Sequence, residues 1–387
     1  MSERIKICVI GASGFVGRVL VEKLIQKDNI EVVAVINSPG NSWPILRFDL
    51  NIVQGNLSNK ASIDAALRNC THVVNLALGS FDKMESDIVN LIESCKLNKV
   101  KRLVHLSSVT VYGEYPDAKS EFEDGPVLAK PKSYGWFKMK QDQKLFEANN
   151  NGLSTIILCP PHVTGPYGRI FHQVVDAIKN DTFALVDNGK YVCNLIDVNN
   201  LCDAIILSLN AENSDGKRIF VTNNDNFTWF NFAQCASKIA NKKIDNIPRI
   251  SAQEAINLKV GYLSLKGLIV SLMKLNEVKT HLNNSVIRHN KIYYYILRQL
   301  VKVSKIFKKK TTDTSVPHNP KVKSNELNVW LCQQQLRGVR HSIKKAETTI
   351  GFQPKIDSYK SFELFENYLT SLYASNTDYS DLIDKLG

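Results

Sequence analysis

The first half of the chain alternates between short apolar runs and longer segments whose apolar residues recur at helical spacing. Residues 5–10 and 31–36 are mostly apolar runs, which is typical of strands covered on both faces. Residues 18–27 lie between them with a period near that of a helix. Strands are also predicted at 53–57, 73–78 and 102–106, and a helix at 82–98. This alternation predicts an α/β fold with a doubly wound parallel sheet.

The alternation fades from residue 226 onward. Residues 227–232 predict a turn that opens a helix, with Thr228 as its N-cap. A chain of 387 residues suits one large or two closely joined domains. We therefore expect a sheet domain over residues 1–225 and a smaller, mostly helical lobe over 226–387, to which part of 166–194 contributes.

Composition narrows the class of protein. Hydrophobic content of 44% and charged content of 22% are ordinary for a soluble globular protein. We expect neither a secretory signal nor a membrane span, because no apolar segment follows Met1 and no apolar run reaches eighteen residues. The eight cysteines are scattered without C-x-x-C spacing, so we expect buried thiols in a cytoplasmic protein and no metal site.

The net charge of +12 is concentrated in a basic segment, residues 265–345, which contains 17 Lys and Arg against three acidic residues. Up to residue 310 its basic and apolar side chains alternate at helical spacing, and residues 308–323 predict a loop. One interpretation is an amphipathic helix that packs on the core and solvates its basic face. Another is that residues 265–323 bind an anionic membrane surface, at the inner face of the membrane. No nucleic acid partner is expected, because no recognised binding motif accompanies the charge.

A glycine-rich turn joins the first predicted strand to the first helix. Gly11, Gly14 and Gly17 have the spacing G-x-x-G-x-x-G directly after residues 5–10. Glycines let the backbone turn sharply and approach a pyrophosphate, while the helix N-terminus supplies amides and a partial positive charge. A strand before and a helix after favour a dinucleotide site over a purely structural turn.

The end of the second strand leaves the choice between NAD and NADP open. An acidic residue there would bind the adenosine ribose, and an Arg would suit a 2′-phosphate. The chain has Asn37 and Ser38 at this place and Arg47 further on. We expect modest discrimination, with NAD favoured over NADP. Asn56 follows the third strand, where it is placed to meet the adenine.

Tyr134 and Lys138 are four residues apart, so on a helix they share one face. A phenol with a pKa near ~10 is a poor base at neutral pH. A neighbouring ammonium and the positive ring of an oxidised nicotinamide would favour the phenolate. The pair can then take a proton from an alcohol while a hydride leaves its carbon. A core Tyr beside a solvated Lys is the alternative.

Three motifs in this order resemble the extended short-chain dehydrogenase/reductase superfamily, in particular the NAD-dependent epimerase/dehydratase family. They are the glycine-rich turn, residues 106–113 (Leu-Ser-Ser-Val-Thr-Val-Tyr-Gly) and the Tyr134–Lys138 pair. The resemblance covers roughly residues 5–225 and 340–370. It implies an NAD(P)-binding Rossmann-type enzyme, and a homodimer, because family members often pair through the helices that carry the tyrosine.

The resemblance also assigns site residues. The Ser108 hydroxyl would hold the substrate oxygen for Tyr134, and Lys138 would also bind the nicotinamide ribose. Without the other motifs, Ser108 would be interpreted as a capping hydroxyl at a strand end. The implied cofactor-binding residues are Gly11, Ser13, Gly14, Phe15, Val16, Gly17, Asn37, Asn56, Leu57, Leu76, Ala77, Tyr134, Lys138 and Pro160.

Substrate contacts are expected from Ser108, Thr110, His162, Arg337 and Arg340. His162 stands where nucleotide-sugar epimerases commonly have Asn against the substrate diphosphate. It either donates there or packs beneath the loop, and both interpretations stay open. The two arginines are candidates for a substrate phosphate.

Two positions depart from the family pattern. Phe137 stands where a small residue, often Ser, precedes the lysine. Cys159 replaces a common Arg before the proline and is expected to deprive the sheet end of a charge. Neither departure removes a catalytic group.

The residues after Ser108 favour one branch of the family. Family 4,6-dehydratases carry Asp-Glu at the positions of Val109 and Thr110, and decarboxylases usually carry Glu at the second. Without a carboxylate there, elimination and decarboxylation lose their proton carrier. The sequence most resembles a sugar 4-epimerase, which acts on a nucleotide-activated or lipid-linked sugar of polysaccharide biosynthesis. The alternatives are an NADP-dependent ketone reductase or hydroxysteroid-type dehydrogenase, and a non-catalytic dinucleotide-sensing scaffold.

Overall fold

The computed structural model describes residues 5–212, 214–258 and 327–374. Met1–Ile256 with Trp330–Gly387 form one compact unit and Asn257–Val329 form another, and the fold and site below belong to the first. Most of the basic segment lies outside the described residues, so its amphipathic and membrane-binding interpretations stay predictions. In the described part of the chain, no helix combines the length and apolarity needed to cross a membrane.

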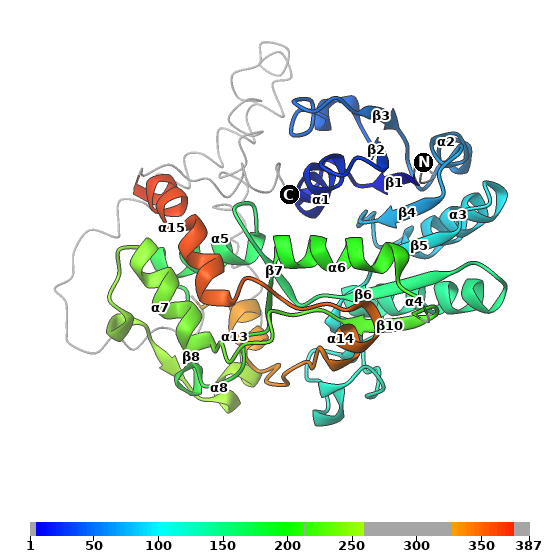
Figure 1. Cartoon of the computed structure of the whole chain (residues 1–387). Helices are drawn as coiled ribbons and strands as arrows, with labels where there is room; N and C mark the ends of the chain where they lie inside the picture. The colour runs from blue at the N-terminus through cyan, green and yellow to red at the C-terminus, as the bar shows by residue number, and fades with distance from the viewer. Residues whose placement is uncertain (1–4, 213, 259–326, 375–387) are drawn as a thin grey trace, which may run out of the picture. The chain divides into compact units, whose positions relative to one another are not determined.

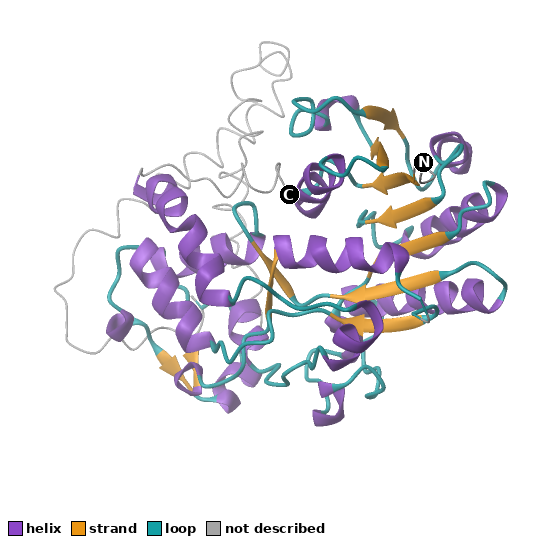
Figure 2. Ribbon diagram, viewed as in Figure 1, coloured by secondary structure: helices purple, strands orange, loops and turns teal. Residues whose placement is uncertain are grey.

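A seven-stranded parallel sheet forms the centre of the first unit, which confirms the predicted fold class (Figure 2). Its strand order is β10-β6-β5-β4-β1-β2-β3. The order reverses between β1 and β4, and ligands bind at such a switch point, outside the carboxyl ends of the strands. The strands are β1 (Ile5–Ile10), β2 (Ile30–Ile36), β3 (Asn51–Gln54), β4 (His72–Asn75), β5 (Arg102–Leu106), β6 (Thr155–Cys159) and β10 (Lys217–Phe220).

The first and fifth of these strands have the predicted bounds, whereas β3 and β4 end earlier than predicted. At the end of β4, the Asn75 side-chain oxygen accepts a hydrogen bond from the Ala77 amide at 3.2 Å. This bond turns the chain away from the sheet, and Leu76 and Ala77 therefore follow the strand instead of extending it.

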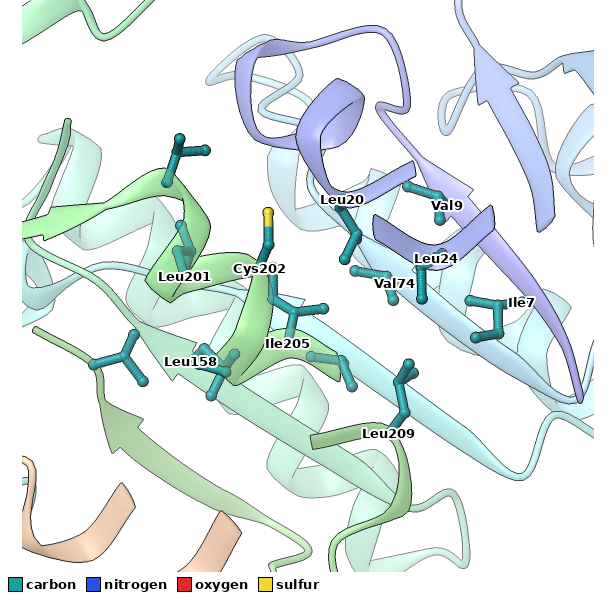
Figure 3. Packing of buried hydrophobic residues seen from close by; sticks show 14 of the residues in the cluster. Ile7, Val9, Leu20, Leu24, Val74, Leu158, Leu201, Cys202, Ile205 and Leu209 are labelled. Atoms are coloured by element: carbon teal, nitrogen blue, oxygen red, sulfur yellow. The ribbon is translucent and has the colours of Figure 1, made fainter. Parts of the chain in front are cut away.

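Helices cover both faces of the sheet (Figure 1). Side chains alternate along β1: Ile7 and Val9 face one layer, and Cys8 and Ile10 face the other. Figure 3 shows Leu20 of α1 and residues of α6 in the first layer. That layer contains α1 (Phe15–Ile25), α6 (Val198–Asn210) and α14 (Lys344–Ile350), and the other contains α2 (Lys60–Ala66), α3 (Met84–Leu97) and α4 (Tyr134–Asn150).

A smaller, mostly helical lobe has a core of its own, built around Phe171, Trp229 and Phe232. Thr228 caps α7 through a capping box with Asn231, as predicted. The lobe helices are α5 (Arg169–Lys179), α7 (Trp229–Ile239), α8 (Ala252–Asn257), α13 (Val329–Gln335) and α15 (Ser358–Ala374). Two short parallel pairs accompany them: β7 (His162–Thr164) with β9 (Leu195–Asp197), and β8 (Leu185–Val186) with β11 (Arg249–Ile250).

Buried hydrogen bonds hold the last helix against the rest of the unit. The Ser361 hydroxyl donates to the Asp197 carboxylate at 2.6 Å and lies 2.9 Å from the Thr164 hydroxyl. The Asn200 amide donates to the Ile356 carbonyl at 2.6 Å. Satisfied buried polar networks specify one arrangement, so these bonds fix how the lobe borders the cavity.

Candidate active site

A cavity of about 890 Å³ lies at the carboxyl ends of the strands, bordered by the lobe. It brings together the three residues expected to be catalytic, which come from the end of β5 and from α4. Nine of the residues expected from the sequence line it: Phe15, Val16, Leu76, Ser108, Thr110, Tyr134, Lys138, His162 and Arg337.

The glycine-rich turn is held by close backbone contacts. Gly11 has a φ of +83°, which favours glycine. A Cβ on Gly17 would lie 2.1 Å from the Gly11 carbonyl oxygen, so any side chain there would displace the turn. Gly14 caps α1 without a side-chain hydrogen bond. The turn therefore fits a pyrophosphate, which binds where a backbone approaches closely at a helix N-terminus.

Polar groups near the expected adenosine end of the cofactor site already make hydrogen bonds or ion pairs with other groups of the protein. Arg47 pairs with Glu22 at 3.0 Å on the surface. The Asn37 carbonyl accepts from the Gln54 amide at 3.3 Å. The side-chain oxygen of Asn56 accepts from the Ser58 amide at 2.9 Å, within its own turn. An adenine contact through Asn56 would use the other atoms of that side chain.

Ser108 and Tyr134 both stand at the start of a helical turn. The Ser108 hydroxyl oxygen accepts from the Thr110 amide at 3.2 Å and caps the short 3-10 turn Val109–Tyr112. This capping leaves the O–H as a donor, so the capping and catalytic roles are compatible. Tyr134 is the first residue of α4, which Ser133 caps by accepting from the Trp136 amide at 3.2 Å.

Lys138 is almost fully buried one turn further along α4. Its amine donates to the Leu106 carbonyl at 2.9 Å, which directs it to the end of β5. Burial lowers the pKa of Lys138 to about 8. The amine therefore changes charge close to neutral pH, whereas an exposed lysine stays charged.

The phenol of Tyr134 behaves differently from the sequence expectation. Burial raises its pKa, and the charge of Asp142 raises it further. The spacing of Tyr134 and Lys138 led us to expect a lowered pKa for the phenol, and the protein's own groups do not produce it. A bound oxidised nicotinamide would bring a positive charge to the site, and an adjacent cation favours the phenolate.

The Asn75 side chain also fixes a buried histidine beneath the site. Its amide nitrogen lies 3.1 Å from Nδ1 of His105 on β5, while its oxygen holds the Ala77 amide. Burial lowers the pKa of His105 well below its usual value, and Lys138 lowers it further, so the ring stays neutral. No sequence pattern marks this pair.

His162 lies edge-on to two indoles on the lobe side of the cavity. Its ring centroid is 6.2 Å from that of Trp229 and 6.1 Å from that of Trp330. Burial and then Arg337 lower the pKa of His162 to about 3, so the ring is neutral at physiological pH. The ring packs against these indoles and also lines the cavity, so both sequence interpretations stay open.

The two candidate arginines have different surroundings. Arg337 lines the cavity, and its Nε has no hydrogen-bond partner among the residues that the structure describes. Burial lowers the pKa of Arg337 to about 10, partly offset by Glu114, so the side chain is still a cation at neutral pH. Arg340 instead donates to Asn226 Oδ1 at 2.7 Å and to the Asn224 carbonyl at 2.9 Å, and it does not line the cavity.

Several lining residues were not identified from the sequence. Glu114 directly follows the motif at 106–113, and it places an exposed carboxylate at the cavity despite the lack of one at 109–110. Helix α13 contributes an indole and two amides, with no local motif to mark them. The lining residues missed in this way include Glu114, Asn194, Trp229, Trp330, Gln333, Gln334 and His341.

A doubly wound sheet, a glycine turn at its switch point and a Ser-Tyr-Lys set in one cavity define a dinucleotide-binding protein of the short-chain dehydrogenase/reductase type. The family model described as "NAD dependent epimerase/dehydratase family" matches residues 7–222, more than half of the chain. The chain belongs to this family.

Individual relatives are distant. The chain is 28% identical to human sterol-4-alpha-carboxylate 3-dehydrogenase, decarboxylating, over 58% of its own length and 64% of the relative. It is 24% identical to a 4-hydroxy-2-methyl-3-oxo-4-farnesyl-3,4-dihydroquinoline-1-oxide ketoreductase of Stigmatella aurantiaca, over 55% and 66% of the two chains. The matches thus span less than two thirds of these relatives.

A similar solved structure is UDP-glucuronic acid 4-epimerase from Bacillus cereus in complex with NAD. It is 16% identical, with a TM-score of 0.62 over 95% of this chain and 100% of that one. This likeness establishes a common fold.

Proposed function

We propose that the protein is an NAD(P)-dependent enzyme that oxidises a sugar hydroxyl and reduces the resulting ketone from its other face. The substrate would be a nucleotide-activated or lipid-linked sugar, and the reaction a 4-epimerisation. The observation that carries this proposal is one cavity that holds Ser108, Tyr134 and Lys138 together with the partly buried cation of Arg337. Family membership supports the use of a nicotinamide cofactor, with NAD favoured.

The chain's own residues supply positioning and proton transfer. A bound nicotinamide supplies the hydride acceptor and, on return, the hydride donor. Ser108 donates a hydrogen bond to the reacting oxygen, and Tyr134 takes its proton as the carbon loses hydrogen. The same phenol returns the proton when the ketone is reduced, so the protein ends the cycle in its starting protonation state. Lys138 holds a positive charge beside the site while it is protonated.

Arg337 favours a substrate that brings negative charge. Arg337 is partly buried, and its Nε has no hydrogen-bond partner among the described residues. A guanidinium withdrawn from water is costly unless an anion pairs with it, and its fork of donors matches a diphosphate. Nucleotide sugars and lipid diphosphate sugars both carry this group. Burial lowers the pKa of Arg337, and the negative charge of the exposed Glu114 carboxylate raises it again in part.

A second candidate is reduction of a ketone on an apolar ring system. Trp330, which is 45% exposed, gives the substrate side a large aromatic surface, and the buried Trp229 also lines the cavity. The two curated relatives named above are a ketoreductase and a sterol dehydrogenase. If the protein is such a reductase, Arg337 contacts the cofactor or has only a structural role.

Product analysis separates the two candidates. The full chain is incubated with NAD and UDP-glucose or UDP-glucuronic acid, and products are identified by NMR. An epimerase converts the sugar without net change in nicotinamide absorbance. A reductase that is given NADPH and a ketone such as a dihydroflavonol instead oxidises one NADPH for each ketone that it reduces. A chain that binds nucleotide but turns over neither class would support the non-catalytic scaffold.

A further inference from the structure

A buried carboxyl group lies one helical turn beyond Lys138. Asp142 is fully buried on α4 and does not line the cavity. Its Oδ2 accepts from the Ser107 hydroxyl at 3.0 Å and from Nε of Arg218 at 2.7 Å. Its Oδ1 has no hydrogen-bond partner in the described ranges. Ser107 directly precedes Ser108, so this carboxyl group touches the strand end that carries the catalytic hydroxyl.

Arg218 comes from the outermost strand, β10, and is largely buried. In the pairing of β10 with β6, it stands two positions before Phe220, the partner of Cys159. Its guanidinium thus reaches the region where Cys159 was expected to leave the sheet end without a charge. Cys159 itself carries no charge there, but Arg218 on the neighbouring strand is close enough to influence the Cys159 thiol.

The ion pair with Arg218 keeps the buried Asp142 carboxyl group ionised. Burial raises the pKa of the Asp142 carboxyl, whereas the charge of Arg218 and the Ser107 hydrogen bond lower it. A buried carboxylate without a partner takes up a proton, because an isolated charge is very costly in an apolar interior. The charge on Asp142 therefore depends on Arg218.

We propose that Asp142 and Arg218 are positioning residues for Lys138. Arg218 keeps the Asp142 carboxylate ionised, and this carboxylate keeps the neighbouring lysine amine charged in its buried place. The proposal rests on the role given to Lys138 in the proposed function and adds the groups that set its charge.

The other ionisable groups around Lys138 are neutral. On α4, burial raises the pKa of the Tyr134 phenol, and on β6 it raises that of the Cys159 thiol. On β5, burial keeps His105 uncharged. Burial is the main cause that lowers the pKa of Lys138, and Asp142 is the first group that opposes it.

The test measures the titration of Lys138 without substrate or turnover. Isotope-labelled lysine side chains of the full chain are titrated by NMR, and Lys138→Met identifies the resonance. We expect wild type to titrate at about 8. Asp142→Asn and Arg218→Met should each lower this pKa by about one unit, the size of a lost nearby charge. Arg218→Lys keeps the cation and should stay near wild type.

Two further variants make the result decisive. Asp142→Asn with Arg218→Met removes both members of the ion pair, so neither is left as a buried charge without its partner; the double variant should fold and show the same shift as one single variant. Asp203→Asn removes the 2.6 Å pair with Lys23 between α6 and α1 and should leave Lys138 unchanged. A folded double variant with the wild-type titration would overturn the proposal. Loss of turnover in Tyr134→Phe tests the proposed function separately, whatever this titration shows.

Discussion

The candidate site has a backbone half, the glycine-rich turn, and a side-chain half, the lobe side of the cavity. The first is one continuous turn, in which the Gly17 position lies against the Gly11 carbonyl and leaves no room for a side chain. The second is assembled from side chains of separate elements, with His162 on β7, Trp229 on α7 and Arg337 after α13. Cofactor binding should therefore be sensitive to added volume, and substrate binding to lost charge.

The largest effect is expected where the two halves meet. Tyr134→Phe keeps the ring and removes the proton carrier, so turnover should fall by about 10²–10⁴-fold. Nucleotide affinity and folding should survive, because the glycine turn is untouched. Kinetics and a nucleotide titration on the same preparation check both statements, and full activity in this variant would move the catalytic assignment elsewhere.

A matched glycine pair tests the backbone half. In Gly17→Ala the new Cβ meets the Gly11 oxygen at 2.1 Å, whereas in Gly14→Ala it lies at 3.3 Å from the same atom. We expect NAD affinity to fall about 100-fold in the first variant, as for a displaced binding group, and only a few-fold in the second. Isothermal titration gives both values, and equal losses would contradict the close-contact argument.

A matched arginine pair tests the side-chain half. Arg337→Met should raise KM for a diphosphate sugar about 10–100-fold, the worth of a lost charged hydrogen bond. Arg340→Met is the control, because its bonds go to Asn224 and Asn226 outside the lining. NAD affinity should change in neither. An unchanged KM in Arg337→Met would mean that Arg337 does not pair with the diphosphate.

The smallest expected effect is a pH dependence of cofactor affinity. Burial lowers the pKa of Lys138 to about 8, so the amine is charged at about pH 7 and mostly neutral at about pH 9. If Lys138 donates to the nicotinamide ribose, affinity for NAD should weaken a few-fold as pH rises through this range. Lys138→Met should bind more weakly and lose the dependence. Fluorescence titration at several pH values measures it.

Local sequence was sufficient for the features that one element determines. The bounds of β1, the turn at Gly11–Gly17 and the cap at Thr228 depend on neighbouring residues, and each was predicted. Tyr134 and Ser108 meet because both stand at element ends on the same edge of the sheet.

Features that depend on tertiary contacts were missed or misplaced. Trp330 reaches the cavity from a helix far along the chain, and no spacing marks it. Arg218 and Cys159 stand on different strands, so the cation near Cys159 becomes apparent only once these strands pair. Arg340 is close in sequence to Arg337, yet its side chain bonds to Asn224 and Asn226, outside the lining.

Hydrogen tracing distinguishes hydride transfer through a nicotinamide from deprotonation of the reacting carbon. The reaction is run in heavy water with the sugar nucleotide or ketone that the protein turns over, and the product is analysed by NMR and mass spectrometry. If the nicotinamide carries the hydride while Tyr134 moves only the oxygen-bound proton, the reacting carbon gains no deuterium from the solvent. Deuterium on that carbon would mean that the carbon itself is deprotonated, and would contradict the account.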